Sequence, residues 1–411
     1  VYAPALDAGL ITPATAIEDS PFYENTSWPQ NDARSYSGMC LVLRGVTSSL
    51  NTISVKTLDK LGLQNSYDFL TQKLGITTLV DHYEQGGREY TDIAYAPLAL
   101  GEQTFGLTVR EMTQAYATFP NMGSFREARS YTHVEDADGN LILDNAQESH
   151  TAISEKAAYY VNYMLSDVVR YGTGTPAAMS NVAVAGKTGT SANNQSRWFA
   201  GYTPYYTAAV WCGYDSPEQV ILSNSWANPA TVMWHKVMEQ LHADLEYRSF
   251  TQPENVGWYS VCSDCGLTAT EACEKDVRDN GGNRVTTVRL FYEDAPNGSC
   301  TCHKLVKICE ESGKIANEYC EEVPGNTVTE KGMLIFNEEW RVHKDEPYVY
   351  NEKNKDSFCT IHTKDSTKPT EPPTESQGPT EPTEPTEAPT PPDVSLPWDE
   401  GEWYERRKIT A

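Results

Sequence analysis

The chain has 411 residues, enough for one sizeable domain with accessory modules, and its 57 acidic residues outnumber its 32 basic ones. The resulting net charge of -25 argues against nucleic acid or an anionic lipid surface as a partner. No run of about 18 apolar residues occurs, so we expect no membrane-spanning helix in this sequence. Because it begins at Val1 without a methionine, we expect it to be a piece of a longer protein.

Residues 1–247 have the pattern of one domain that mixes helices and strands. Apolar spacing predicts two helices stopped by Gly62 and Gly75. Thr108 and Glu111 form a predicted capping box at the start of a third helix. The fourth and clearest helix is expected to begin after Ser154 and to end at Gly172.

Two stretches rich in β-branched and aromatic residues follow, residues 182–191 and 197–215, with a turn at 202–204. We predict two antiparallel strands, with Lys187 on the inner one. The domain therefore combines helices with an antiparallel sheet.

The composition changes near Thr251, where two small cysteine-rich modules are predicted at 251–305 and 306–365. Each has a Cys-x10-Cys pair followed by Cys-x2-His. Three thiolates and an imidazole suit tetrahedral zinc, but an exported protein forms disulfides more readily, within each Cys-x10-Cys loop and between Cys265 and Cys302. We favour disulfides or free thiols, and assign no metal ligand and no cofactor.

Two further segments complete the chain. Residues 366–397 are rich in proline, threonine and glutamate and poor in apolar groups, so we expect a disordered spacer. Residues 398–411 form a short C-terminal tail.

The stretch Lys187-Thr188-Gly189-Thr190 carries the clearest chemical signal. A lysine can assist a nucleophilic serine, and the threonine hydroxyls can hold a substrate carboxylate. Gly189 lets a substrate approach and pair along the strand edge. Ser-x-x-Lys, Ser-Asp-Asn and Lys-Thr-Gly are the motif set of penicillin-binding proteins and β-lactamases. The third is present here, and Ser49-Leu50-Asn51 matches the second with its middle residue changed.

Five blocks then occur in the order seen in one family: residues 1–21, 48–62, 98–125, 172–175 and 185–215. In these blocks the sequence resembles class A, bifunctional penicillin-binding proteins of Gram-positive bacteria. The likeness is dense from Val1 to about Asp215. It is looser through the cysteine modules, which look like C-terminal extensions of some clostridial members.

The resemblance implies an α+β fold, an antiparallel sheet covered by helices and incomplete at its N-terminus. It implies a D,D-transpeptidase that cross-links peptidoglycan stem peptides outside the cytoplasmic membrane and is acylated by β-lactams. The parent protein would carry a membrane anchor and a glycosyltransferase domain.

The resemblance also assigns roles to residues of this chain. Ser49 would relay protons, Asn51 would contact the substrate amide, and Lys187 would complete the catalytic polar network. Thr188, Gly189 and Thr190 would form the substrate-binding strand, with the threonine hydroxyls on the terminal carboxylate and the Thr190 N–H as an oxyanion donor.

The nucleophile of such an enzyme is missing from the sequence. No serine is followed three residues later by lysine, and only Thr57 with Lys60 and Thr301 with Lys304 have that spacing with threonine. The family places Ser-x-x-Lys shortly before the block that opens this chain. We therefore expect the serine upstream of Val1 and a fragment that is inactive alone.

Other interpretations remain at this stage. Ser49 and Asn51 are also typical helix N-caps, and that role could coexist with a catalytic one. A D,D-carboxypeptidase or a β-lactamase would share the motifs but transfer the acyl group to water. A non-catalytic wall-binding or β-lactam-sensing protein would be favoured if the full gene lacked Ser-x-x-Lys.

Overall fold

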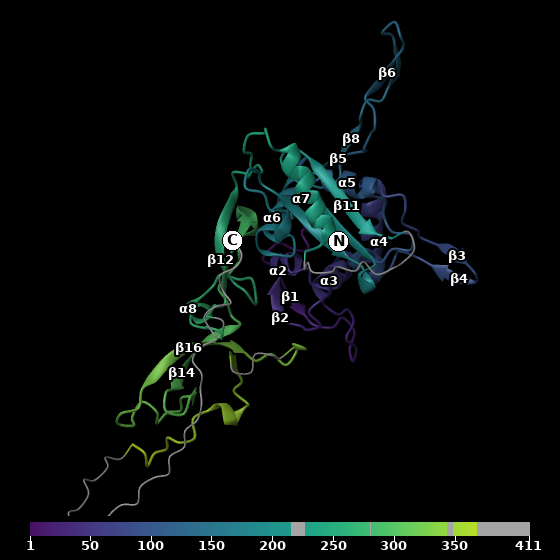
Figure 1. Cartoon of the computed structure of the whole chain (residues 1–411). Helices are drawn as coiled ribbons and strands as arrows, with labels where there is room; N and C mark the ends of the chain where they lie inside the picture. Colours follow the sequence, from purple (N-terminus) through teal and green to yellow (C-terminus); the bar gives the residue numbers. More distant parts are fainter. Residues whose placement is uncertain (215–226, 280, 343–347, 368–411) are drawn as a thin grey trace, which may run out of the picture. The chain divides into compact units, whose positions relative to one another are not determined.

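The computed structural model describes residues 1–214, 227–279, 281–342 and 348–367 (Figure 1). Residues Val1–Thr367 form one compact unit. The predicted acidic spacer, from residue 368 onward, and the tail at 398–411 lie outside the described residues. Within the described ranges, none of the helices has the length and apolar character needed to cross a bilayer.

The central sheet has three antiparallel strands, β9 (Ala185–Thr190), β10 (Ser196–Tyr202) and β11 (Thr207–Gly213), in the order β11-β10-β9. The second predicted stretch folds back on itself, because the Thr203 hydroxyl accepts the N–H groups of Tyr205 and Tyr206 and closes a turn. Strand β10 is therefore the middle strand. Lys187 lies on β9, an outer strand among those described, and its predicted place on an inner strand is wrong.

Helices cover both faces of this sheet (Figure 1). Neighbouring residues on a strand point to opposite faces, and Val184 and Ala185 accordingly belong to different clusters. On one face α7 (Pro229–Leu241) places Trp234 against Phe199, with ring centroids 5.0 Å apart. On the other face lie α5 (Val109–Ala117) and α6 (Glu155–Tyr171).

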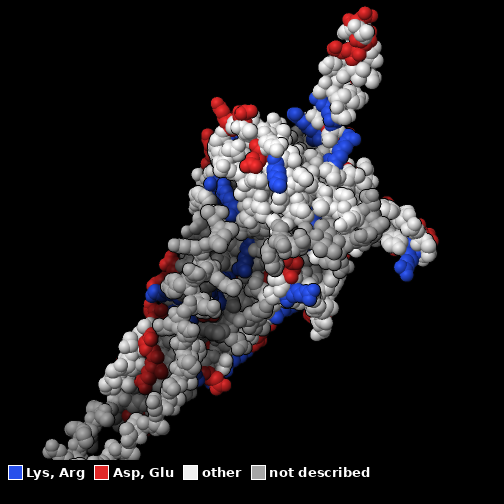
Figure 2. Space-filling view, viewed as in Figure 1, with Lys and Arg blue, Asp and Glu red and all other residues white. Residues whose placement is uncertain are grey.

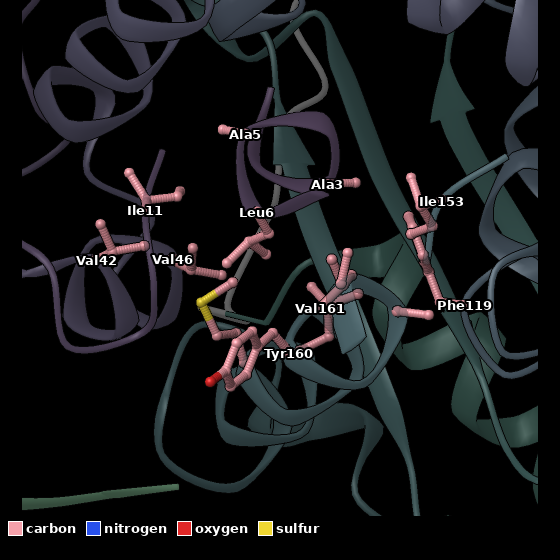
Figure 3. Close-up of a cluster of buried hydrophobic side chains, with 14 of the residues drawn as sticks. Ala3, Ala5, Leu6, Ile11, Val42, Val46, Phe119, Ile153, Tyr160 and Val161 are labelled. Atoms are coloured by element: carbon pink, nitrogen blue, oxygen red, sulfur yellow. The ribbon is translucent and has the colours of Figure 1, made fainter. Parts of the chain in front are cut away.

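The long helix α6 forms the centre of the larger core. Its N-cap is Ser154, whose hydroxyl accepts the Ala157 N–H at 3.2 Å, and it stops before Gly172, as the sequence predicts. Figure 3 shows Tyr160 and Val161 of α6 facing side chains of α1 (Tyr2–Asp7) and α2 (Val42–Thr47). These side chains belong to one buried cluster, which fixes α2 relative to the sheet.

The remaining helices of this region support the same core. Helix α3 (Asn51–Leu61) ends at Gly62, whose φ is +89°, and a helical segment from Leu63 to Lys73 ends shortly before Gly75. The Thr108–Glu111 capping box at α5 is present as predicted. Strand β1 (Ala16–Asp19) pairs with β2 (Gly38–Leu41), which leads directly into α2.

Three small strand pairs extend from this core: β3 (Tyr83–Gln85) with β4 (Arg88–Tyr90), β5 (Ser124–Arg126) with β8 (Ser149–Thr151), and β6 (His133–Glu135) with β7 (Leu141–Asp144). Figure 2 shows acidic side chains gathered at the end of the projection labelled β6 in Figure 1.

The cysteine-rich region contains two further sheets. Strands β12 (Val256–Cys262) and β13 (Val285–Phe291) form an antiparallel pair, with α8 (Glu271–Glu274) between them in sequence. Strands β14 (His303–Cys309), β15 (Lys314–Ile315), β16 (Val328–Ile335) and β17 (Val349–Tyr350) form the second sheet. None of the ten cysteines, all of which lie in described ranges, is in a disulfide.

Two features of the structure concern the predicted domain boundaries, which remain predictions. Apolar residues of β12 and β13 share the large core with α6, and β14 crosses the predicted boundary between residues 305 and 306. The cysteine modules are thus continuous with the structure around them.

Candidate active site

The candidate site centres on a contact between β9 and the turn that joins α2 to α3. The Lys187 ammonium donates to Ser49 Oγ at 2.7 Å and to the Thr188 carbonyl at 3.2 Å. Ser49 lies just before α3, and Lys187 pairs with Ala200 of β10. The fold therefore brings together the two motifs identified in the sequence.

Burial sets the electrostatic character of this lysine. Taking the ammonium out of water disfavours its charged form and lowers the pKa of Lys187 to about 8. A lysine with this pKa exchanges its proton near neutral pH, as a proton-transfer group must. Lys187 can therefore pass a proton to or from the Ser49 hydroxyl.

The backbone of Ser49 adopts a left-handed conformation, with φ of +56°. The Leu50 N–H bonds to the Gly45 carbonyl, and the Ser49 N–H bonds to the Val46 carbonyl. These two hydrogen bonds form a Schellman motif that ends α2, with Ser49 at the position where glycine is usual. A serine here is strained, and a strained residue in contact with Lys187 is a reason to look for function.

The first N–H group of α3 is capped by a side chain from another segment, and neither Ser49 nor Asn51 acts as the N-cap residue. The N-cap residue is Leu50, which offers no side-chain acceptor. Instead, Asn31 Oδ1 accepts the Asn51 N–H at 2.9 Å. The helix-cap reading of Ser49 and Asn51 is therefore wrong, since Ser49 ends α2 and Asn51 is already the first helical residue.

A buried carboxylate holds this cap in place. Asp19 accepts hydrogen bonds from Asn31 Nδ2 at 2.7 Å and from the Thr52 hydroxyl at 2.6 Å. It also accepts the N–H and hydroxyl of Ser37, at 2.7 and 2.8 Å. Asp19 was not singled out in the sequence, because its partners lie up to 33 positions away.

The predicted substrate residue Asn51 is held apart from the Lys187–Ser49 pair. Its side-chain amide donates to the Gln30 carbonyl at 2.7 Å. The contact of Asn51 with a substrate amide remains a prediction.

The end of β9 presents hydroxyl groups beside this pair. The Thr188 hydroxyl lies 2.8 Å from the hydroxyl of Thr173, and Thr190 Oγ1 accepts from Arg197 at 3.1 Å. Thr173 and Arg197 both lie in blocks that carry the family resemblance. The sequence favoured a helix stop and loop over a site role for the segment with Thr173, and it gave Arg197 no role. A cation and three hydroxyls at one strand end suit a carboxylate ligand.

The open edge of β9 offers backbone donors as well. The Ser191 N–H donates to the Ser196 carbonyl at 3.0 Å, which makes this facing pair a hydrogen-bonded one. Because such pairs alternate in an antiparallel ladder, Thr190 opposite Arg197 is a non-hydrogen-bonded pair. The Thr190 N–H therefore points away from β10, toward the open edge.

Gly189 and Asn228 shape the opposite side of this strand. A Cβ on Gly189 would lie 3.0 Å from the Trp198 Cβ, tight enough to press β9 away from β10. Asn228, the N-cap of α7, donates to the Gly189 and Trp198 carbonyls at 3.3 and 3.1 Å. Asn228 thereby fixes the end of β9 to the helix, a role that no sequence motif indicated.

The threonine alternatives for the nucleophile are not at this site. Thr57 is fully buried within α3, and Thr301 lies between cysteines near β14. Among the described residues, neither threonine makes a hydrogen bond with Lys187.

The family described as the penicillin binding protein transpeptidase domain matches residues 1–228. The chain belongs to this family. All six predicted site residues fall inside the matched range, so the predicted family is confirmed.

Curated relatives agree with this membership. Penicillin-binding protein 1A of Clostridium perfringens is 32% identical over 327 residues, which cover 74% of this chain and 36% of that protein. Penicillin-binding protein 1A of Clostridium acetobutylicum is 34% identical over 267 residues, covering 62% of this chain and 31% of that protein. The chain thus spans about a third of these relatives' length.

Solved structures share the fold of this penicillin-binding transpeptidase domain. Penicillin-binding protein 1A from Haemophilus influenzae has a TM-score of 0.57 at 19% identity, covering 73% of this chain and 47% of that one. PonA1 from Mycobacterium tuberculosis in complex with penicillin V has a TM-score of 0.53 at 21% identity, covering 61% and 69%. The predicted α+β transpeptidase fold is confirmed.

Proposed function

We propose that this chain is the D,D-transpeptidase portion of a bifunctional peptidoglycan synthase that acts outside the cytoplasmic membrane. In this proposal it cross-links peptidoglycan stem peptides through a serine acyl-enzyme, and β-lactams acylate the same serine. The observation that carries it is the 2.7 Å bond between Lys187 Nζ and Ser49 Oγ inside a matched transpeptidase domain.

The proposed reaction has two acyl transfers. The nucleophilic serine gives its proton to the lysine of its own Ser-x-x-Lys motif and forms an ester with the penultimate D-alanine carbonyl carbon, while the C–N bond to the terminal D-alanine breaks. The leaving nitrogen takes a proton from the Ser49 hydroxyl, which recovers one from Lys187. An amine of a neighbouring stem then attacks the ester and loses a proton to the Ser49–Lys187 pair, while the released serine oxygen takes its proton back from the Ser-x-x-Lys lysine.

The substrate positions follow from β9. The hydroxyls of Thr188 and Thr190 hold the donor's terminal carboxylate, while Gly189 allows the peptide to lie along the open edge. The outward N–H of Thr190 is one oxyanion donor. Asn51 contacts the substrate amide after leaving the Gln30 carbonyl.

The acylated serine is proposed to lie in a segment upstream of Val1, since no Ser-x-x-Lys occurs in these 411 residues. Residues 1–411 alone should then form no covalent adduct with fluorescent penicillin. Stoichiometric labelling of this chain would contradict the proposal, and peptide mapping of the adduct would identify the serine used instead.

The test of the activity uses the protein with its upstream segment included. Lys187→Ala should lower the rate of penicillin acylation by about 100-fold, the lower range for loss of a general acid–base group. Lys236→Ala, at an exposed position of α7, is the matched control and should acylate at the parent rate. Unchanged acylation in Lys187→Ala would remove Lys187 from the mechanism.

Product analysis separates transpeptidation from hydrolysis. Mass spectrometry of a donor stem peptide incubated with an acceptor amine should detect the cross-linked amide and free D-alanine. Hydrolysed donor with no amide would instead identify a D,D-carboxypeptidase.

A further inference from the structure

Two buried clusters of cysteine and histidine lie in the C-terminal region, outside the transpeptidase site. One contains Cys309, Cys320, Cys359 and His362, whose ligand atoms all lie within 4.8 Å of one another. The same holds for the equivalent residues of the first copy, Cys262, Cys273, Cys300 and His303. All eight side chains are buried, so each repeat directs three sulfurs and one imidazole nitrogen to a single point.

The atomic separations match a tetrahedral metal site. Zinc bound at about 2.3 Å to sulfur and about 2.0 Å to nitrogen separates these ligand atoms by about 3.6 Å. In the second cluster, His362 Nδ1 lies 3.3 Å from Cys309 Sγ and 3.6 Å from Cys359 Sγ. In the first, His303 Nδ1 lies 3.4 Å from Cys262 and Cys300 and 3.8 Å from Cys273.

Disulfides explain the second cluster poorly. It contains three cysteines, so any disulfide leaves a third buried thiol and a buried histidine with no function. A disulfide also leaves no reason for the imidazole to direct Nδ1 at the sulfurs. A metal ion uses all four groups, which outweighs the preference for disulfides that the sequence alone supports.

The other ring nitrogen of each histidine lies beside a carboxylate. His362 Nε2 lies 2.8 Å from Glu311 Oε2. His303 Nε2 lies 3.2 Å from Asp276 Oδ2 and 3.4 Å from Asp264 Oδ2, both buried carboxylates. A carboxylate behind the distal nitrogen is the usual partner of a metal-bound histidine, because it fixes the tautomer that leaves the other nitrogen free to bind.

Backbone amides point at the sulfurs as donors. The Asn317 N–H donates to Cys320 Sγ at 3.3 Å. In the first copy, Asp264 N–H donates to Cys262 Sγ at 3.4 Å and Thr270 N–H to Cys273 Sγ at 3.5 Å. Sulfur that accepts backbone hydrogen bonds has the environment of a thiolate, the form that binds metal.

We propose that the chain binds two zinc ions, one at Cys309, Cys320, Cys359 and His362 and one at Cys262, Cys273, Cys300 and His303. Four protein ligands complete a tetrahedron and leave no open position, so both sites are structural. The apolar clusters around them are small, and small modules need such a staple.

Comparison of the two copies distinguishes the metal ligands of the first copy from the two additional cysteines that lie near them. Cys265 and Cys302 lie close enough to Cys262 and Cys300 to form an alternative four-sulfur group. The second copy has Ser312 and Ile361 at these two positions yet keeps the other four residues. The shared four are therefore the ligands, and Cys265 and Cys302 are dispensable for binding.

Metal analysis of the purified chain tests the proposal. Inductively coupled plasma mass spectrometry should find about two zinc ions per chain. Replacement by Co²⁺ should give the intense visible absorption of tetrahedral thiolate coordination. Less than 0.2 zinc per chain after purification with added zinc, together with a mass lowered by 2 Da per cysteine pair without reductant, would establish disulfides and overturn it.

Single substitutions assign the ligands. Cys320→Ser and Cys273→Ser should each lose one zinc ion, whereas Cys265→Ser and the distant Cys212→Ser should keep both. Zinc loss in Cys265→Ser with retention in Cys273→Ser would overturn the ligand set proposed for the first copy. Should a variant not fold, stepwise release of zinc from the unsubstituted chain by a thiol-modifying mercurial gives the same count. Penicillin labelling does not enter these readouts, so their outcome is independent of the proposed transpeptidase activity.

Discussion

At the scale of single residues, Ser49 combines a backbone cost with a chemical role. Its left-handed backbone is disfavoured for any residue with a Cβ, by about 1 kcal/mol. Glycine adopts the same conformation freely. The hydroxyl that meets Lys187 is therefore retained at a position where glycine would give the more stable turn.

This conflict gives a measurable prediction. Ser49→Gly and Ser49→Ala both remove the hydroxyl, but only glycine relieves the backbone, so Ser49→Gly should be more stable than Ser49→Ala by about 1 kcal/mol. Urea denaturation followed by circular dichroism measures the difference. Equal free energies of unfolding would mean that the turn adapts to a Cβ without strain.

Local patterns in the sequence predicted only part of this site. Periodicity and glycine stops located α3 and α6, and the Lys187 and Ser49 motifs located the two polar segments. The Asn31 cap and the Asp19 carboxylate were missed because each acts on residues about 20 to 33 positions away in the chain. The outer position of β9 was also missed, since strand order depends on which segments meet and not on their composition.

At the scale of the elements, the start of α5 depends on a single carboxylate. Glu111 accepts the N–H and hydroxyl of Thr108, and also those of Thr77 at 2.7 and 2.9 Å. Burial alone would raise the pKa of Glu111, but these hydrogen bonds outweigh it and lower the pKa to about 2. The predicted capping box thus also ties α5 to the segment after Gly75.

A pH-dependent loss of stability follows. A carboxylate with a lowered pKa in the folded state stabilises that state above the unfolded pKa, near 4.5, and ceases to do so as the pH falls toward 2. Glu111→Gln should therefore lower the free energy of unfolding by about 2 kcal/mol at pH 7, and the gap should close between pH 5 and about 2. Denaturant titrations at several pH values, with the exposed Glu102→Gln as control, test this. A gap that does not change with pH would contradict it.

At the scale of the whole molecule, the transpeptidase core and the first cysteine module meet at α6. The Tyr160 hydroxyl donates to Asp294 at 2.6 Å and accepts the Phe291 N–H at 2.9 Å. Lys156 also contacts Asp294, at 2.8 Å. Helix α6 therefore packs against the sheet that carries Lys187 and is hydrogen-bonded to the end of the β12–β13 pair.

Removal of the Tyr160 hydroxyl tests whether it connects α6 to the β12–β13 pair. Tyr160→Phe should lower the free energy of unfolding by about 1 to 2 kcal/mol, because it leaves a buried N–H without its acceptor. Hydrogen exchange should become faster in residues 285–291. Tyr159→Phe is a matched control, since the buried Tyr159 hydroxyl has no hydrogen-bond partner within the described ranges and its removal should cost little. Equal effects of the two substitutions would refute the connection.

The cysteine modules show the same division between local and global information. The repeat of Cys-x10-Cys and Cys-x2-His was visible in the sequence, and its eight residues are those that the structure gathers into two buried clusters. The repeat did not distinguish disulfide bonds from metal coordination, because that distinction depends on the distances between the ligand atoms and on the carboxylates beside each histidine. Asp264, Asp276 and Glu311 have no spacing that marks them as partners of His303 and His362.

The contact between Lys187 and Ser49 joins positions 138 residues apart in the chain. A ribosome must therefore release β9, together with β10 that pairs with it, before the two side chains can meet. Chains cut short within the preceding stretch could bury much of the α1–α3 core and still lack the lysine. The Lys187–Ser49 contact therefore forms only in chains whose synthesis has passed strand β9, long after Ser49 has left the ribosome.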